Sequence, residues 1–280
     1  MPELPEVEVL RRHLEPLLLG RRVAGVRVLR PKAVRPGTGE ELAALLQGTR
    51  FGKVGRRGKY LVFELSAREG ARRVLGHLGM TGRMYLRATS GPVPKHAAVV
   101  LPLDGGKESF VFEDPRGFGR FSTDLGPLDE LGPEPWDRGL DAGGFGRALA
   151  GTGRAIKVVL LDQSVIAGVG NIYASEALFR AGIAPARPAN RLKPAEATRL
   201  LAAIRTVLDE AIALGTKAPL DFAGGEDGLF YYGSGGDASV EMERFRVYDR
   251  AGEPCPECGG PIRRVALGGR GTFWCPKCQR

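Results

Sequence analysis

The sequence predicts an α+β protein with a β-sandwich or barrel in its N-terminal half and a helical domain in its C-terminal half. Short apolar segments, separated by glycine, proline or charged residues, run from Val23 to about Thr123. Helical periodicity replaces them further along the chain, and all four cysteines fall in the last segment. The length of 280 residues suits two domains.

A helix is expected to flank the β half at the N-terminus. Pro5 suits the first turn of a helix and Gly20 suits its end. Between them, Leu10, Leu14 and Leu17 are spaced to form one apolar face. This helix does not explain why "MPE", with a proline directly after the initiator methionine, should open the chain.

The predicted strands are short and read "VAGVRVLR", "YLVFEL", "AAVVLPL" and "SFVFED" in chain order. The stretch Leu125–Gly144 that follows them is dense in proline, glycine and aspartate, which is typical of a linker. We therefore place the boundary between the two domains in this stretch.

A helix is expected from about Pro194 to Gly215, because aliphatic residues recur there at helical spacing. These residues are Leu200, Leu201, Ile204, Val207, Leu208, Ala211 and Ile212. Their pattern indicates core packing, and we assign them no chemistry. The glycine-rich stretch Gly224–Ser239 that follows is a long loop, of the kind that is usually functional or mobile.

The segment "IKVVLLDQSVIAGVGNIYASEALFRAGI" predicts a helix, a glycine-containing turn and a second helix. Asn171 stands where it can cap the second helix, whose N-terminus would favour an anion such as a DNA phosphate. An ordinary turn between two helices is the alternative interpretation.

The charge balance favours a polyanionic partner, and nucleic acid is the first candidate. Lys and Arg number 41 against 32 Asp and Glu, which gives a net charge of +9. A solvated basic surface without a partner is the alternative. We find neither an apolar stretch of about 18 residues nor a signal peptide, so we expect a soluble, cytoplasmic protein without a membrane partner.

Two cysteine pairs predict one structural zinc ion. Cys255 and Cys258 form "CPEC", and Cys275 and Cys278 form "CPKC" after a segment of hairpin length. A redox pair is the alternative for a single CxxC, but no βαβ context accompanies these two. Between the pairs, Arg270 lies among glycines, where it could meet a phosphate or be a solvated turn residue.

Two further loops combine apolar and basic residues. "HLGMTGR" places Met80 between glycines, and "DPRGFGR" carries Arg116 and Phe118. Such side chains suit a wedge that enters a base stack and fills the gap left by an extruded nucleotide. Each also has a structural interpretation: Met80 could fill a core gap, Phe118 could belong to a sheet, and Arg116 could pair with Asp114.

Taken together, the motifs resemble those of the bacterial formamidopyrimidine-DNA glycosylases. They are "PELPEVE", "RRGKYL", "HLGMTG", "DPRGFGR", "GVGNIYASE", and the cysteine pairs with "GRGTF" between them. The motifs follow the family order over nearly the whole chain. Endonuclease VIII is similar in layout but typically opens with PEGPE, and Leu4 argues against it.

The resemblance implies a specific α+β fold: an N-terminal β-sandwich with flanking helices, and a C-terminal helical domain with a helix-two-turn-helix and a zinc-finger hairpin. We accordingly expect a β-sandwich catalytic domain at residues 1–130 and a hinge at 131–144. The helical DNA-binding domain with a lesion-capping loop is expected at 145–245, and the zinc-finger hairpin at 246–280.

The resemblance also implies catalytic roles. Pro2, once Met1 is removed, would present a secondary amine that attacks the anomeric carbon of a damaged nucleotide and forms a Schiff base. Glu3 would act as a general acid on the sugar ring oxygen. Lys59 would assist the β-elimination and hold a phosphate, and Arg270 would assist the δ-elimination. Glu6 resembles a carboxylate that organises the site.

For DNA binding, the resemblance implies that His96, Arg116 and Asn171 contact the backbone, while Met80, Arg116 and Phe118 fill the void in the duplex. The chain has Gly117 and Thr152 where the family usually has basic residues. We therefore expect some phosphate affinity either to be lost or to move to Arg154 or Lys157.

We conclude that the resemblance implies a bifunctional glycosylase and abasic-site lyase. It would remove 8-oxoguanine and formamidopyrimidines from double-stranded DNA by β,δ-elimination, with one structural zinc ion and as a monomer. Lys217 and Ala218 replace small hydroxyl residues before the capping loop 224–239, so little preference between these lesions is expected. The rivals are an endonuclease VIII-like enzyme for oxidised pyrimidines and a non-catalytic zinc-ribbon protein that binds damaged DNA.

Overall fold

The computed structural model describes residues 2–67, 70–217 and 245–280. The chain forms two compact units: the first contains the residues up to Asp129, and the second contains Glu130–Lys217 and the described C-terminal residues. Each unit has an apolar core of its own. Among the described residues, we find no helix that is long and apolar enough to cross a membrane.

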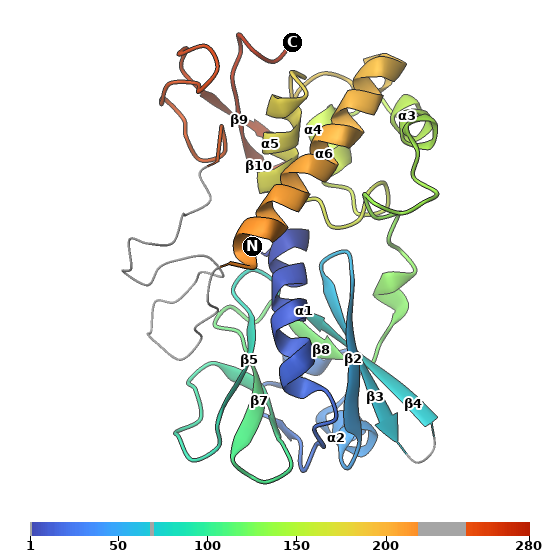
Figure 1. Ribbon diagram of the computed structural model, residues 1–280, viewed down its shortest axis with the longest axis vertical. Coiled ribbons are helices and arrows are strands. Elements are labelled where there is room, and N and C mark those ends of the chain that lie inside the picture. Colours follow the sequence, from blue (N-terminus) through green and yellow to red (C-terminus); the bar gives the residue numbers. More distant parts are fainter. Residues whose placement is uncertain (1, 68–69, 218–244) are drawn as a thin grey trace. The chain divides into compact units, whose positions relative to one another are not determined.

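The first unit contains two helices and eight strands among its described residues (Figure 1). In chain order these are α1 (Leu4–Leu18), β1 (Arg27–Val28), α2 (Gly39–Leu46), β2 (Arg50–Arg57), β3 (Tyr60–Ala67), β4 (Gly70–His77), β5 (Arg83–Ala88), β6 (Ala97–Pro102), β7 (Glu108–Glu113) and β8 (Arg120–Ser122). Short 3₁₀ turns follow β1 and β8, at Pro31–Val34 and Gly126–Leu128.

The strands form two four-stranded antiparallel sheets, which confirms the sandwich over the barrel. One sheet has the order β2-β3-β4-β8 and the other has the order β1-β6-β7-β5. Phe63 from the first sheet and Phe110 from the second lie with ring centroids 5.6 Å apart in one buried cluster. The inward faces of the two sheets therefore share one aromatic core.

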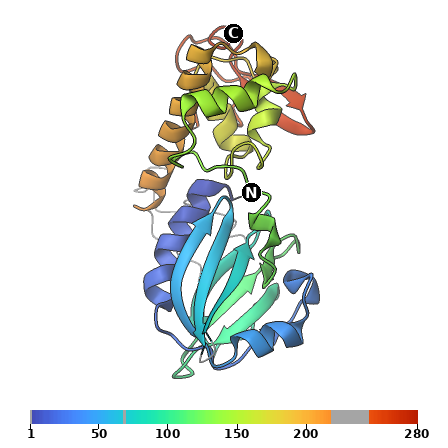
Figure 2. The same ribbon diagram turned by 90° about the vertical axis from the view of Figure 1, so that its right-hand side faces the viewer.

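Helix α1 packs along β2 on the flank of the sandwich (Figure 2). Pro5 lies in its first turn, as predicted, and Gly20 follows its end with a φ of +77°. Leu10, Leu14 and Leu18 are fully buried. The prediction for Leu17 was wrong, because a strict four-residue spacing brings Leu18 into the core and leaves Leu17 42% exposed.

The second unit is helical and ends in a β-hairpin. Its helices are α3 (Ala142–Ala150), α4 (Ile156–Leu160), α5 (Asn171–Arg180) and α6 (Pro194–Gly215), and its strands are β9 (Arg263–Leu267) and β10 (Arg270–Trp274). Helix α6 has the predicted limits, and six of the seven residues of the predicted stripe are buried, five of them in the helical core cluster.

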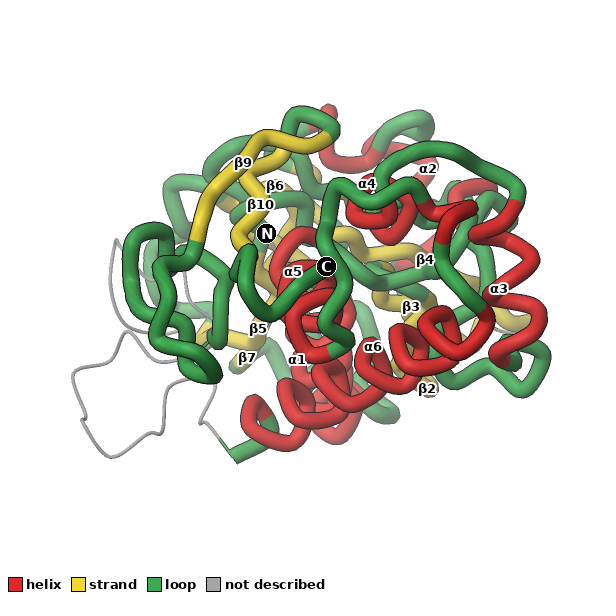
Figure 3. The backbone as a smooth tube through the Cα atoms, turned by 90° about the horizontal axis from the view of Figure 1, so that it is seen from above, coloured by secondary structure: helices red, strands yellow, loops and turns green. Residues whose placement is uncertain are grey.

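The hairpin β9–β10 lies beside α5 (Figure 3). Glu176 of α5 attaches the segment that leads into the hairpin: its carboxylate accepts hydrogen bonds from the backbone N–H groups of Arg246, Val247 and Tyr248 at 2.8 to 3.0 Å. The three donors stabilise the negative charge of the buried carboxylate, and the carboxylate supplies hydrogen-bond acceptors for three backbone N–H groups. The zinc-finger segment is thus anchored on α5.

Candidate active site and nucleic-acid interface

The start of α1 places two predicted catalytic residues at a fixed point. Pro2 is half-buried and Glu3, the N-cap residue, is 1% exposed. The backbone N–H of Glu3 donates to the Glu6 carboxylate at 2.6 Å, so Glu6 fixes the backbone at the start of α1. The residue that follows Met1 therefore adjoins a buried helix start and not a loose tail.

The turn between β2 and β3 carries Lys59. Gly58 in this turn has a φ of +55°, a conformation that favours glycine. The Lys59 side chain is largely buried, with the residue 8% exposed. Its ammonium group lies close enough to His77 at the end of β4 to affect the pKa of that imidazole.

His77 lies beside Lys59, and the sequence interpretation did not single it out. Burial, followed by the positive charges of Lys59 and Arg120, lowers its pKa from 6.5 to about 4. The ring lies against Tyr60 at a centroid distance of 4.7 Å, and Nδ1 accepts a hydrogen bond from the backbone N–H of Gly79 at 3.2 Å. His77 is therefore neutral at pH 7 and carries its proton on Nε2. Its place at the head of "HLGMTG" was the available signal.

The two predicted wedge loops lie against each other. Thr81 Oγ1 donates to the Asp114 carboxylate at 2.7 Å, and that carboxylate also accepts the N–H groups of Arg116 and Gly119. Arg116 and Phe118 are exposed, with the guanidinium 5.0 Å from the ring centroid, so neither residue fills the core. Met80, on the first loop, is half-buried.

His96 is half-buried and held by Arg30, which the sequence interpretation did not single out. Arg30 Nη2 lies 2.9 Å from His96 Nδ1, and Nη1 donates to the Asp114 carbonyl at 2.8 Å. Because arginine only donates, Nδ1 is the acceptor and Nε2 carries the proton of the imidazole. The two terminal nitrogens of Arg30, Nη1 and Nη2, thus connect His96 to the loop that bears Arg116. A surface pocket of about 500 Å³ adjoins this loop.

In the second unit, the predictions for Asn171 and Lys157 need correction. Asn171 is the first residue of α5 and does not cap it: the N-cap is Gly170, and the Asn171 amide donates to Gly271 O of the hairpin at 2.9 Å. Lys157 is fully buried, and its ammonium donates to Asn171 O at 2.8 Å and to Ser175 Oγ at 2.5 Å. In this arrangement Lys157 supports the start of α5 from inside, and a phosphate cannot reach it.

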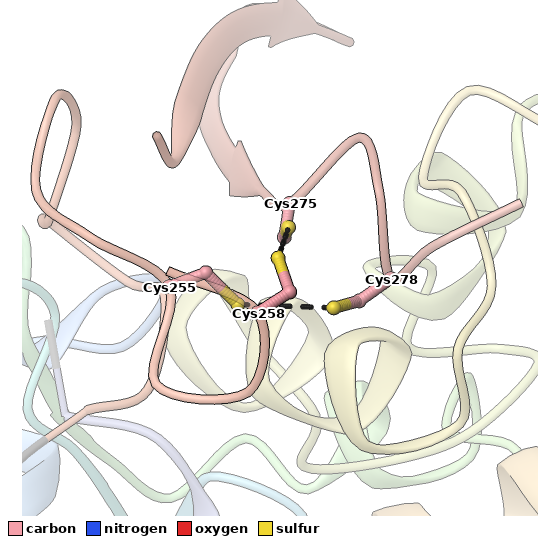
Figure 4. A group of neighbouring side chains, drawn as sticks. All are labelled: Cys255, Cys258, Cys275 and Cys278. Carbon is pink, nitrogen blue, oxygen red and sulfur yellow. Dashed lines mark hydrogen bonds between the residues drawn. The ribbon is translucent and has the colours of Figure 1, made fainter. Parts of the chain in front are cut away.

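The four cysteines converge on one point (Figure 4). Their Sγ atoms lie within 4.8 Å of one another, with 3.8 Å between Cys255 and Cys278 and 3.5 Å between Cys258 and Cys275. A tetrahedron with Zn–S bonds of about 2.3 Å has edges of about 3.8 Å, so the cluster fits one zinc ion. Four sulfur donors leave no open position, which makes the site structural.

Arg270 begins β10 directly after the turn Gly268–Gly269 and is exposed. The positive φ values of both glycines, +55° and +72°, let the hairpin reverse within two residues. The hairpin tip therefore presents the Arg270 guanidinium to solvent.

Some predicted features lie outside the described residues, namely Met1, Ala218 and the loop 224–239. Lys217 is described, and lies exposed just after the end of α6. In the region that had been expected to supply alternative phosphate contacts, Arg154 pairs with Asp162 at 2.9 Å.

Three domain families match the chain in succession. Residues 1–121 match the formamidopyrimidine-DNA glycosylase N-terminal domain, residues 131–221 match the H2TH domain of the same proteins, and residues 252–280 match a zinc finger found in FPG and IleRS.

Whole-chain comparisons agree with these matches. A formamidopyrimidine-DNA glycosylase of Symbiobacterium thermophilum is 43% identical, over 100% of this chain and 89% of the relative. Wild-type Lactococcus lactis Fpg (MutM) with DNA containing N7-benzyl-Fapy-dG is 32% identical, with a TM-score of 0.84 and full coverage of both chains. The same protein bound non-covalently to DNA with an AP site is 32% identical, with a TM-score of 0.83 and 99% coverage of each chain.

The contact between the two wedge loops predicts unequal effects of two glycine substitutions. A Cβ on Gly79 would lie 2.6 Å from Gly119 N, whereas a Cβ on Gly117 would have no atom within 4 Å, and both residues have positive φ. Gly117→Ala should cost only the backbone strain, roughly 1–2 kcal/mol. Gly79→Ala should cost at least about 1 kcal/mol more, because the loops must separate. Urea unfolding measures both, and equal losses would mean that the loops do not pack as described.

The lowered pKa of His77 predicts a specific loss of stability in acid. Between pH 6.5 and about 4 the unfolded chain binds a proton at this residue and the folded chain does not, so stability falls as the pH falls. A shift of this size corresponds to about 3 kcal/mol below pH 4. His77→Gln should therefore flatten the fall in unfolding free energy between pH 7 and 4 relative to wild type. Parallel curves for the two proteins would contradict the assignment.

Proposed function

Because this chain belongs to the formamidopyrimidine-DNA glycosylase family, we propose that it excises oxidised purines from duplex DNA and cleaves the strand at the resulting abasic site. The observation that carries the proposal is the full-length relationship to such enzymes, together with a proline directly ahead of a buried helix start. A helix start that is fixed in this way can hold an amine against a sugar with little loss of entropy on binding.

Pro2 is the proposed nucleophile. After removal of Met1, its secondary amine attacks the anomeric carbon of the damaged nucleotide, the base departs with a proton, and a Schiff base to the sugar remains. Glu3, one residue away and 1% exposed, is the proposed general acid for the ring oxygen. Glu6 supports both residues through its hydrogen bond to the Glu3 N–H.

Lys59 is the proposed group for β-elimination. The Schiff base withdraws electrons and makes the C2′ proton acidic; water accepts that proton, the electron pair forms the C2′=C3′ bond, and the 3′ phosphate leaves with its oxygen. A neutral His77 beside Lys59 adds no second positive charge to the site at pH 7. Lys59 is then the proposed contact for the phosphate.

The loops of the first unit are proposed to hold the duplex open. Exposed Phe118 and Arg116, and half-buried Met80, provide apolar and stacking surface for the gap left by an everted nucleotide. His96, with its proton on Nε2, and Asn171, at the N-terminus of α5, are proposed backbone contacts. The proposed partner is thus double-stranded DNA that contains oxidised bases or abasic sites.

The zinc hairpin is proposed to deliver Arg270 to the DNA for the δ-elimination. Zinc bound by Cys255, Cys258, Cys275 and Cys278 would supply folding energy to a hairpin that has little core of its own. The residues of the hairpin then fix the position of the exposed guanidinium. Lesion preference, monomeric state and a cytoplasmic location stay predictions.

Retention of Met1 should abolish catalysis without abolishing DNA binding. While Met1 remains, the Pro2 nitrogen is an amide and no nucleophile, so borohydride trapping on abasic DNA should fall by at least about 100-fold. Protein prepared with methionine aminopeptidase inhibited provides this form, and treatment of the same sample with the aminopeptidase provides the matched control. Equal trapping before and after treatment would show that another amine reacts.

Arg270→Ala should weaken DNA binding while zinc stays bound. Loss of one phosphate contact should reduce the slope of log K against log salt by about 0.9. Arg263→Ala, on β9 of the same hairpin, is the matched control and should leave the slope unchanged, because its position is next to the cysteine end and not at the tip. If both variants reduce the slope equally, Arg270 acts only through the general charge of the hairpin.

A further inference from the structure

We propose that Arg56 is a positioning residue for the lyase step, because it joins the helix that begins beside Pro2 to the turn that carries Lys59. This inference rests on the proposed function of Pro2 and Lys59. It concerns a residue that contacts neither DNA nor the reacting atoms in the proposed mechanism.

Two hydrogen bonds of the Arg56 guanidinium point in different directions. Nε donates to Glu8 Oε2 of α1 at 3.0 Å, and Nη1 donates to the Gly58 carbonyl at 3.0 Å. Glu8 lies about one turn from the start of α1, and Gly58 directly precedes Lys59. One side chain therefore spans the gap between the two elements that carry the proposed nucleophile and the proposed lysine.

The bridge is shielded from solvent and charged. The side chains of Arg56 and Glu8 are 9% and 11% exposed, so salt screens the pair much less than a surface pair. Burial raises the pKa of Glu8, but hydrogen bonds from Arg11, Arg12 and Arg56 outweigh it and hold the pKa below its ordinary value. Glu8 stays ionised at neutral pH, and the bridge persists.

Arginine is suited to this position and lysine is not. The planar guanidinium offers donors in a fixed fork, so that one side chain can hold a carboxylate and a carbonyl at set angles. A lysine could keep the charge pair with Glu8 but would lose the fixed geometry toward Gly58. A displacement of about 1 Å at a catalytic group can cost about 100-fold in rate, so a small shift of the Lys59 turn should be measurable.

Arg12 provides a matched control. Its Nε donates to Glu8 Oε1 at 2.8 Å, so it pairs with the same carboxylate, but its side chain is 47% exposed and both partners lie on α1. Substitution of Arg12 removes a hydrogen bond to Glu8, and no hydrogen bond of Arg12 reaches the Lys59 turn. If only the ion pairs of Glu8 mattered for cleavage, loss of either guanidinium would slow cleavage to a similar extent.

The experiment measures strand cleavage at a preformed abasic site in duplex DNA, under single turnover and saturating enzyme, with full-length zinc-bound protein from which Met1 has been removed. Arg56→Lys should cleave at least about tenfold more slowly than wild type, with a DNA dissociation constant within about twofold and an unchanged Tm. Arg12→Lys should cleave within about twofold of wild type. Equal losses in the two variants would overturn the proposal.

A double variant tests whether Arg56 acts through Lys59. If it does, Arg56→Lys in a Lys59→Ala background should cause no further slowing beyond Lys59→Ala alone. If the losses in rate of the two single variants multiply in the double variant, the proposal is overturned. It is also overturned if the wild type cleaves DNA and Lys59→Ala cleaves at the same rate. A wild type that neither cleaves nor forms a trapped complex would instead contradict the proposed function itself. If Arg56→Lys binds DNA poorly, Glu8→Gln takes its place in the comparison. In the Lys59→Ala background, Glu8→Gln should cause no further slowing, and multiplied losses would overturn the proposal.

Discussion

The burial of the first turn of α1 is the constraint on which the proposed chemistry depends. Leu4 is fully buried, and the Glu3 N–H donates a hydrogen bond to the Glu6 carboxylate. The helix behind it is fixed in turn by Leu10 and Leu14 in the core of the sandwich. The nitrogen of Pro2, the proposed nucleophile, is thereby held at one place, which is what attack on a single sugar carbon requires.

Partly buried charged side chains position the other proposed site elements of the first unit. Glu8 draws Arg56 and the Lys59 turn toward α1, while burial keeps His77 neutral beside the lysine. Asp114 serves the wedge loops in the same way, since one carboxylate accepts donors from both loops. A few carboxylates and arginines thus determine where the proposed reactive groups and the exposed stacking groups lie.

The sequence predicted the features that depend on local pattern: the limits of α6, the two-sheet β half with its N-terminal helix, and the cysteine cluster. It failed where tertiary contacts decide. Leu17 and Leu18 are both leucine, and only packing against the sandwich selects Leu18. Asparagine is a residue type that often caps helices, yet the Asn171 amide donates a hydrogen bond to Gly271 of the hairpin, which is distant in sequence. Lysine side chains are usually exposed, but Lys157 is fully buried and its ammonium group donates to the Asn171 carbonyl. These outcomes depend on neighbours that no short window contains.

The central claim is that the amine of Pro2, held by the start of α1, forms the covalent bond to DNA. The most direct measurement is peptide mapping of the borohydride-trapped complex: after digestion of the DNA and treatment with trypsin, mass spectrometry locates the residual sugar adduct. The account predicts the adduct on the N-terminal peptide, residues 2–11, at the nitrogen of Pro2. An adduct on a lysine, at Lys59 or elsewhere, with an unmodified N-terminal peptide would contradict it.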